Sequence, residues 1–269
     1  IILPMLPHKN LLPDVNLTPY SIWLATVVVS GISYLSYLLK RYVFHEAGTL
    51  VSGIIGGLYS STATISVLAR KSRKASEQEA TDYVAAMLLA ISMMFLRFMI
   101  LILIFSREIF LSIYPYLLTM AVVAAIVAWF IHSRQKRSND QPVEAEEDDS
   151  SNPLEFKVAL IFAVLFVVFT FLTHYTLVYA GTGGLNLLSF VSGFSDITPF
   201  ILNLLQNTGS VAALIITACS MQAIISNIMV NMFYALFFAG KGSKLRPWIL
   251  GGFGVVIACN LVLLLFFYI

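Results

Sequence analysis

Charged residues are scarce in this chain, and their scarcity argues against a soluble fold. Asp, Glu, Lys and Arg make up 11% of the 269 residues, whereas hydrophobic residues make up 59%. Soluble domains typically carry about 25% charged residues. Several apolar runs approach the roughly 20 residues that cross a bilayer as a helix. The composition therefore predicts an all-α polytopic membrane protein whose first partner is the lipid bilayer.

Cysteine is nearly absent, and catalytic motifs are missing. Cys219 and Cys259 both fall inside apolar runs, which predicts packed side chains and no disulfide framework or metal site. We find no zinc motif and no Ser-His-Asp order, and no Lys-Ser or Lys-Thr follows GGLNLLSFVSG to make a phosphate loop. The sequence thus predicts a protein that is not an enzyme and that has neither a cofactor nor a bound metal.

The beginning of the chain also lacks an initiator methionine and a signal peptide. We therefore expect further sequence before Ile1 in the full protein. Four prolines occur by residue 19, and they predict an extended, non-helical approach to the membrane over residues 1–19.

Two apolar segments, at 49–69 and 185–205, are interrupted at their middles by small and polar residues. Aligning Gly57 with Gly193 also places Ser60 on Asp196, so the two segments correspond at one constant offset. The following helices correspond as well, since ISMMFLR resembles ISNIMVN. We therefore predict two membrane repeats, at 20–132 and 155–269, joined by a flexible polar linker at 133–154.

Each repeat is expected to contain three spans and one interrupted segment. The predicted spans cover 20–39, about 80–106, a run ending near 132, about 155–180, about 210–238 and a last run to 269. Ser76 and Glu79 have the spacing of a capping box before the second span. Arg107 and Pro115 predict a tight turn after that span.

The basic residues favour a topology in which the interrupted segments do not cross. If all eight apolar segments crossed, the basic residues outside the membrane would divide 9 to 6 between the faces. If 49–69 and 185–205 are re-entrant, 13 lie on one side, leaving Lys9 and Arg107 opposite and Arg97 in the membrane. Cytoplasmic loops are enriched in basic residues, which favours the second topology. With three crossings per half the repeats are inverted, as in many secondary transporters.

The interrupted segments also contain signals for helix ends. Glycines 53, 56 and 57 are expected to end a first half-helix, and Ser61 or Thr62 to cap a second. In the copy, Thr198 followed by proline predicts a helix start with proline at the first helical position. Both second half-helices would point N-termini toward the midplane, where their free amides favour an anion or an electronegative group.

Asp196 is the acidic residue predicted to lie deep in an apolar segment, and Arg97 is the corresponding basic one. A charge there is costly, so each should have a partner or line water, and the two could pair with each other. The functional hypothesis makes Asp196 a proton or cation site and Arg97 a counter-ion or substrate anchor. The alternatives are a structural ion pair, or a helix cap in the case of Asp196.

The predicted site for the solute or ion lies at the crossing of the two interrupted segments. The candidate residues are Gly57, Ser60, Ser61, Thr62, Thr64, Arg97, Gly193, Asp196, Thr198, Asn227 and Asn231. For the two asparagines, hydrogen bonding between helices is the commoner use in membranes.

The stretch GIIGGLYSSTATISVLARKSR, together with LPMLP at the start and the helix of Arg97, resembles a known family. It is similar to the uncharacterised C-terminal membrane domain of MgtC/SapB-type bacterial and archaeal proteins. The resemblance implies a prokaryotic membrane domain that often follows an MgtC-like domain. In the second half, GFSDITPF keeps Asp196 but has Thr198 where the family often has a second acid, so no metal role is carried over.

Two functions are open at this level. The first is a transporter or permease for a small ion or polar solute. The second is a non-transporting regulatory or scaffold protein that acts through a partner complex or a missing N-terminal membrane domain. We expect an inner-membrane location, with loops 70–80, 133–154 and 240–247 on the cytoplasmic side. We expect no nucleic-acid partner. A homo-oligomer is one of the oligomeric states that the sequence leaves open.

Overall fold

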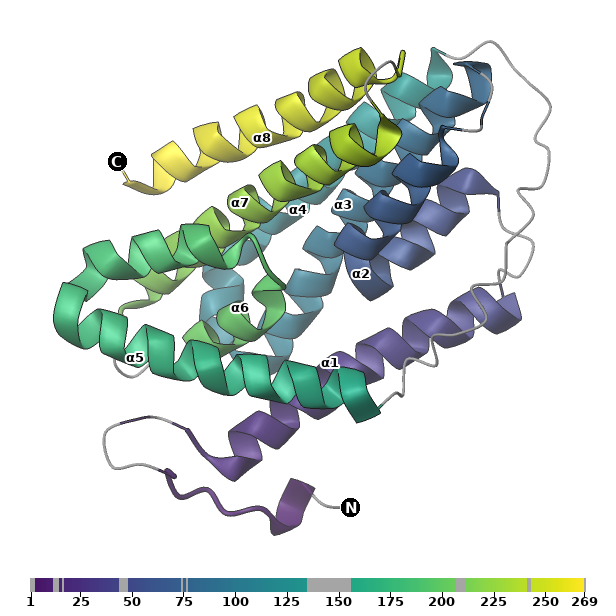
Figure 1. Cartoon of the computed structure of the whole chain (residues 1–269). Coiled ribbons are helices and arrows are strands. Elements are labelled where there is room, and N and C mark those ends of the chain that lie inside the picture. The colour runs from purple at the N-terminus through teal and green to yellow at the C-terminus, as the bar shows by residue number, and fades with distance from the viewer. Residues whose placement is uncertain are drawn as a thin grey trace. The chain divides into compact units, whose positions relative to one another are not determined.

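The structure is a computed structural model in which helices account for most of the described chain (Figure 1). It describes residues 3–11, 15, 17–43, 48–73, 75, 77–134, 156–206, 211–240 and 243–268. Within these residues, seven helices are long and apolar enough to cross a membrane. The prediction of an all-α polytopic membrane protein is thereby confirmed.

The bounds of the helices follow the predicted order. They are α1 (Pro19–Leu38), α2 (Thr49–Lys71), α3 (Glu77–Phe105), α4 (Arg107–Ser133), α5 (Phe156–Ser192), α6 (Ile197–Gln206), α7 (Ala213–Ala239) and α8 (Arg246–Tyr268). A 3-10 turn at Leu3–Met5 precedes them, and a π-helical turn at Leu39–Val43 extends α1. Residues 135–154 of the predicted linker and Ser76 of the predicted capping box lie outside the described residues.

The tight turn predicted between Arg107 and Pro115 is wrong. Ser106 alone interrupts the helical backbone, Arg107 begins α4, and Pro115 lies inside that helix. The Ser106 hydroxyl accepts a hydrogen bond from the Ile109 amide at 3.3 Å, so a serine cap starts the new helix at once. The charged residues Arg107 and Glu108 therefore form the first turn of α4. Pro115 lies further along the same helix, where its missing amide removes one backbone hydrogen bond.

The chain packs as two compact units. Unit 1 contains Ile1–Tyr34, Ile100–Tyr114 and Ser151–Asn227, and unit 2 contains Leu35–Met99, Pro115–Ser150 and Ile228–Ile269. Helices α1, α3, α4 and α7 contribute residues to both units, whereas α2 lies wholly in unit 2 and the stretch 182–206 lies wholly in unit 1.

In unit 2, the beginning of α2 lies against α3 through glycine and alanine. A Cβ atom at Gly53 would lie 2.3 Å from the Ala86 carbonyl oxygen, and one at Gly57 would lie 2.5 Å from the Ala90 Cα. Such close backbone approach requires glycine, as is common between membrane helices. The step from Gly53 to Gly57 equals the step from Ala86 to Ala90, so residue numbers rise together and the two helices run parallel here.

Helix α2 breaks at Ser60. Its backbone there is extended, with φ −158° and ψ 110°, and it separates a first arm, 49–59, from a second arm, 61–71. A Cβ atom at Gly56 would lie 2.4 Å from the Thr64 hydroxyl oxygen. In a straight helix, residues eight apart are separated by about 12 Å. The two arms of α2 therefore fold toward each other.

In unit 1, α5 breaks at Gly181, where φ is 59° and ψ is −151°, a conformation that favours glycine. The helix then continues over 182–192, and a short turn leads into α6 (Figure 1). The Cys219 thiol lies 3.4 Å from the Asn186 amide oxygen. A Cβ atom at Gly193 would lie 2.3 Å from the Ser226 Cβ. The two partners of each pair are as many residues apart in the sequence as Gly53 and Ala86 are. Residue numbers therefore rise together in the two segments, and 182–192 also runs parallel to α7.

Helix α6 packs into unit 1 with one continuous buried stretch, from Ile197 to Leu205. The Asn203 amide donates a hydrogen bond to the Thr170 hydroxyl at 2.6 Å. The rings of Phe169 and Phe200 meet edge to face, with centroids 5.6 Å apart. These contacts join α6 to the first part of α5.

Candidate functional site

Ser60 caps the second arm of α2. Its hydroxyl oxygen accepts a hydrogen bond from the Ala63 amide at 3.3 Å. The predicted caps, Ser61 and Thr62, are wrong because a cap residue needs an extended backbone, and only Ser60 departs from helical geometry within α2. The side chain of Ser61 is instead buried.

Asp196 caps α6 in the same way. Its carboxylate accepts a hydrogen bond from the Thr198 amide at 2.9 Å. Because α6 begins at Ile197, Pro199 is the third helical residue and not the first, as predicted. The amide missing from proline has no helical partner at that position either.

The two caps occupy corresponding positions, because Ser60 aligns with Asp196 when Gly57 is placed on Gly193. The structure corrects the expectation that Asp196 is buried deep in an apolar segment, since this residue is exposed while the neighbouring Thr198 is buried. Of the interpretations weighed for Asp196, the helix cap is the one for which the structure gives a direct contact.

The end of each first half-helix leaves carbonyl oxygens without helical partners, and the next helix supplies donors to them. In unit 2, the Arg97 guanidinium donates to the Tyr59 carbonyl at 2.8 Å. In unit 1, the Asn227 amide donates to the Gly193 carbonyl at 3.2 Å. Arg97 also brings a positive charge to the negative end of a helix dipole.

Sequence reasoning missed one donor, Ser226. Its hydroxyl donates to the Phe190 carbonyl at 2.7 Å. In the alignment of the two repeats, Ser226 corresponds to Ala90, which is the residue that Gly57 contacts. The spacing of the repeats could therefore have identified Ser226 as a contact of Gly193. Asn227 and Ser226 thus act as hydrogen-bonding groups between helices, which is the commoner use weighed for the asparagines.

Arg97 and Asp196 lie in different units, and each has a backbone partner of its own. The hypothesis that they pair with each other stays a prediction. Within the described residues, the ion pair found joins His132 to Asp82 at 2.7 Å, between α4 and α3. It lies outside the predicted site.

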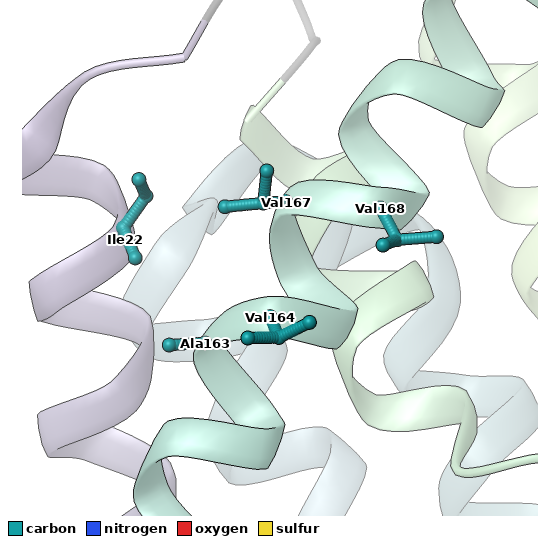
Figure 2. Close-up of a pocket in the computed structure, with 5 residues that line it drawn as sticks. All are labelled: Ile22, Ala163, Val164, Val167 and Val168. Atoms are coloured by element: carbon teal, nitrogen blue, oxygen red, sulfur yellow. The ribbon is translucent and has the colours of Figure 1, made fainter.

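The remaining predicted residues differ in accessibility. Asn231 is fully buried, whereas Thr62 and Thr64 are partly exposed. A groove in unit 1 is lined by apolar side chains (Figure 2), namely Ile22, Ala163, Val164, Val167 and Val168. None of the predicted site residues lines it, and within the described part of the chain no three His, Cys, Asp or Glu residues gather as metal ligands do.

The comparison with known proteins assigns a family. A family model described as a domain of unknown function, DUF4010, matches residues 27–239, which include the break at Ser60 and the turn between α5 and α6. The chain belongs to this family. This DUF4010 protein is similar to an uncharacterized protein of Aquifex aeolicus (strain VF5), at 25% identity over 224 residues, 82% of this chain and 96% of the relative. No solved structure matches it. The resemblance to MgtC/SapB-type proteins stays a prediction.

The caps lead to a prediction about stability. Asp196→Ala and Ser60→Ala should each lower the free energy of unfolding by about 1 kcal/mol, because each leaves a helix-start amide without its acceptor. Asp196→Asn keeps an acceptor oxygen, so its free energy of unfolding should stay close to that of the unchanged protein. Thermal unfolding in detergent measures the difference.

Ser66→Ala is the matched control for the cap variants. The Ser66 hydroxyl donates to the Thr62 carbonyl within the second arm of α2. Removing this hydroxyl therefore leaves no amide at the start of a helix without its acceptor. A stability change of at most about 0.5 kcal/mol is expected for it. If Asp196→Ala were as stable as Ser66→Ala, the cap would have no part in holding α6.

Proposed function

We propose that this DUF4010 protein is a membrane transporter or permease for a small ion or polar solute. It is built, in this proposal, from two inverted halves that each carry a re-entrant broken helix with polar groups at its break. The observation that carries the proposal is that both broken segments pack on their following helices in the same parallel register.

The register supports a re-entrant α2. If α2 ran straight beside α3, Lys71 would be level with Ile104, about 40 Å along α3 from its start at Glu77, given a rise of about 1.5 Å per residue. The chain between Lys71 and Glu77 reaches at most about 20 Å. The second arm must therefore return toward the level where the first arm began. Each arm has 11 residues and extends only about 16 Å, which is less than the thickness of the membrane core.

The segment from 182 to 206 is constrained in the same way. A straight path beside α7 would bring Gln206 level with Ala239, about 39 Å from the start of α7 at Ala213. The residues between Gln206 and Ala213 reach about 25 Å. Six crossings then remain, by α1, α3, α4, the first part of α5, α7 and α8, which gives three per half and an inverted second half.

Polar backbone at the breaks supports transport over simple packing. Broken helices inside a membrane are tolerated where they are buried in protein or line a polar cavity. Ser60 and Asp196 each begin a half-helix whose amides favour an electronegative group. Arg97 adds a positive charge at the break in unit 2. At the break in unit 2 these groups favour a ligand with electronegative atoms, whereas the Asp196 carboxylate at the start of α6 is itself negative and disfavours an anion there.

Water accessibility of the breaks tests the proposal. In a variant with Cys219→Ser and Cys259→Ser, Thr62→Cys and Ser195→Cys place single thiols at the breaks without removing either cap. We expect a charged, membrane-impermeant methanethiosulfonate reagent to label both, because a transport pathway must hydrate them. Labelling is read by mass spectrometry on reconstituted vesicles.

Val255→Cys is the control for surface position. Val255 is 47% exposed on the apolar helix α8, so its thiol should face lipid and resist a charged reagent. Failure of Thr62→Cys and Ser195→Cys to react from either face would contradict the transport proposal. It would favour the alternative, a regulatory or scaffold protein acting through a partner or an MgtC-like domain.

A further inference from the structure

The ends of α2 and α7 are joined by two arginines in unit 2. The Arg70 guanidinium carbon lies 4.3 Å from the centroid of the Phe238 ring. The Arg73 guanidinium donates to the Phe237 carbonyl at 3.4 Å, where it also meets the negative end of the α7 dipole. Both arginines are exposed.

The two stretches of sequence that follow from these helix ends are rich in basic residues. Residues 70–76 and 240–246 contain seven basic residues and no acidic one: Arg70, Lys71, Arg73, Lys74, Lys241, Lys244 and Arg246. The contacts of Arg70 and Arg73 place the end of α2 against the end of α7, although the two helices are far apart in the sequence. Arg70 and Arg73 therefore place two positive charges beside the end of α7 in unit 2.

An exposed aromatic surface adjoins this charge. Phe233 and Phe237 are 61% and 64% exposed. Their rings stack with centroids 6.1 Å apart, one turn apart on α7. The surface therefore runs from the basic end of α7 along a helix that is long and apolar enough to cross the membrane.

We propose that this surface binds an anionic phospholipid, with the phosphate at Arg70 and Arg73 and an acyl chain along Phe233 and Phe237. The contact with Phe238 holds the exposed Arg70 guanidinium at the end of α7, beside Arg73, so that two positive charges are available to one phosphate. Charge complementarity selects an anionic headgroup over a zwitterionic one. This proposal does not depend on transport.

The test uses the full chain in detergent and native mass spectrometry. We expect it to bind phosphatidylglycerol in preference to phosphatidylcholine, and Arg70→Gln with Arg73→Gln to weaken phosphatidylglycerol binding by about tenfold or more. The double variant Arg70→Lys with Arg73→Lys keeps the charges and should retain most of the binding. The lysine variant also shows whether the fold tolerates substitution here.

Arg134→Gln is the matched control. Arg134 is also exposed and lies over an aromatic ring at 4.5 Å, but this ring belongs to Phe130, which is only four residues earlier in the chain. Its loss should change binding by less than about twofold. The proposal is overturned if the double glutamine variant retains the preference for phosphatidylglycerol, if Arg134→Gln weakens it equally, or if inorganic phosphate competes as well as the lipid does.

Discussion

Cysteines introduced at Tyr42 and Ala75 are expected to react with a membrane-impermeant thiol reagent from the same face of the membrane. These positions flank α2, and in the proposed re-entrant path the folding of its arms at Ser60 returns the chain to the level at which it entered. The effect is all or none, since a reagent added to one side either reaches both thiols or only one. Intact oriented vesicles, before and after permeabilisation, provide the measurement.

Ser106→Cys is the internal reference for the opposite face. It lies between α3 and α4, one crossing away from Ala75, and should react only from the other side. If Tyr42→Cys and Ala75→Cys reacted from opposite faces, α2 would be a crossing helix, and the inverted relation of the halves would be lost.

The second broken segment has its own version of this experiment. Tyr179 and Ala212 flank the stretch 182–206, and both are exposed. Their cysteine variants should react from one face, the face of Ser106→Cys. A result that differed between the two segments would mean that the repeats do not share a topology, whatever their sequence correspondence.

Replacing Gly57 with alanine should destabilise the protein strongly for so small a change. The added Cβ would lie 2.5 Å from the Ala90 Cα and 2.7 Å from its carbonyl oxygen, and these are backbone atoms that cannot rotate away. Overpacking of this kind costs about 1–3 kcal/mol. Gly53→Ala meets the Ala86 backbone in the same way, and the double variant should lose more than either alone.

Gly31→Ala and Gly254→Ala are the controls, because an added Cβ at either position meets nothing within 4 Å. Alanine is the better helix former by roughly 0.5–1 kcal/mol, so these variants should be unchanged or slightly more stable. Thermal unfolding in detergent compares them. Equal stability of Gly57→Ala and Gly31→Ala would mean that α2 and α3 do not approach at Gly57, and it would remove the register from which the re-entrant path is inferred.

Much of the local structure could be predicted from sequence because its signals are local. The apolar runs predicted the spans, and the polar interruptions predicted a break in each segment. The prediction that glycines 53, 56 and 57 end the first half-helix is wrong, because they lie inside the helix and the break comes at Ser60. The alignment of the two repeats placed Ser60 on Asp196, and these two residues are the caps. The prediction chose a cap one or two residues too late in α2, because several serines and threonines in a row can all cap a helix, and the backbone conformation decides among them.

The composition by itself determined that this is a helical membrane protein, and the repeat spacing predicted two copies of one broken segment, since neither needs tertiary contacts. Only the tertiary structure decided that Arg97 binds the Tyr59 carbonyl and that Asp196 is exposed. The physical reason is that a polar residue within an apolar run must find some partner, but the run does not specify which one. That choice depends on the close glycine contacts between helices, which set the groups that each polar side chain can reach.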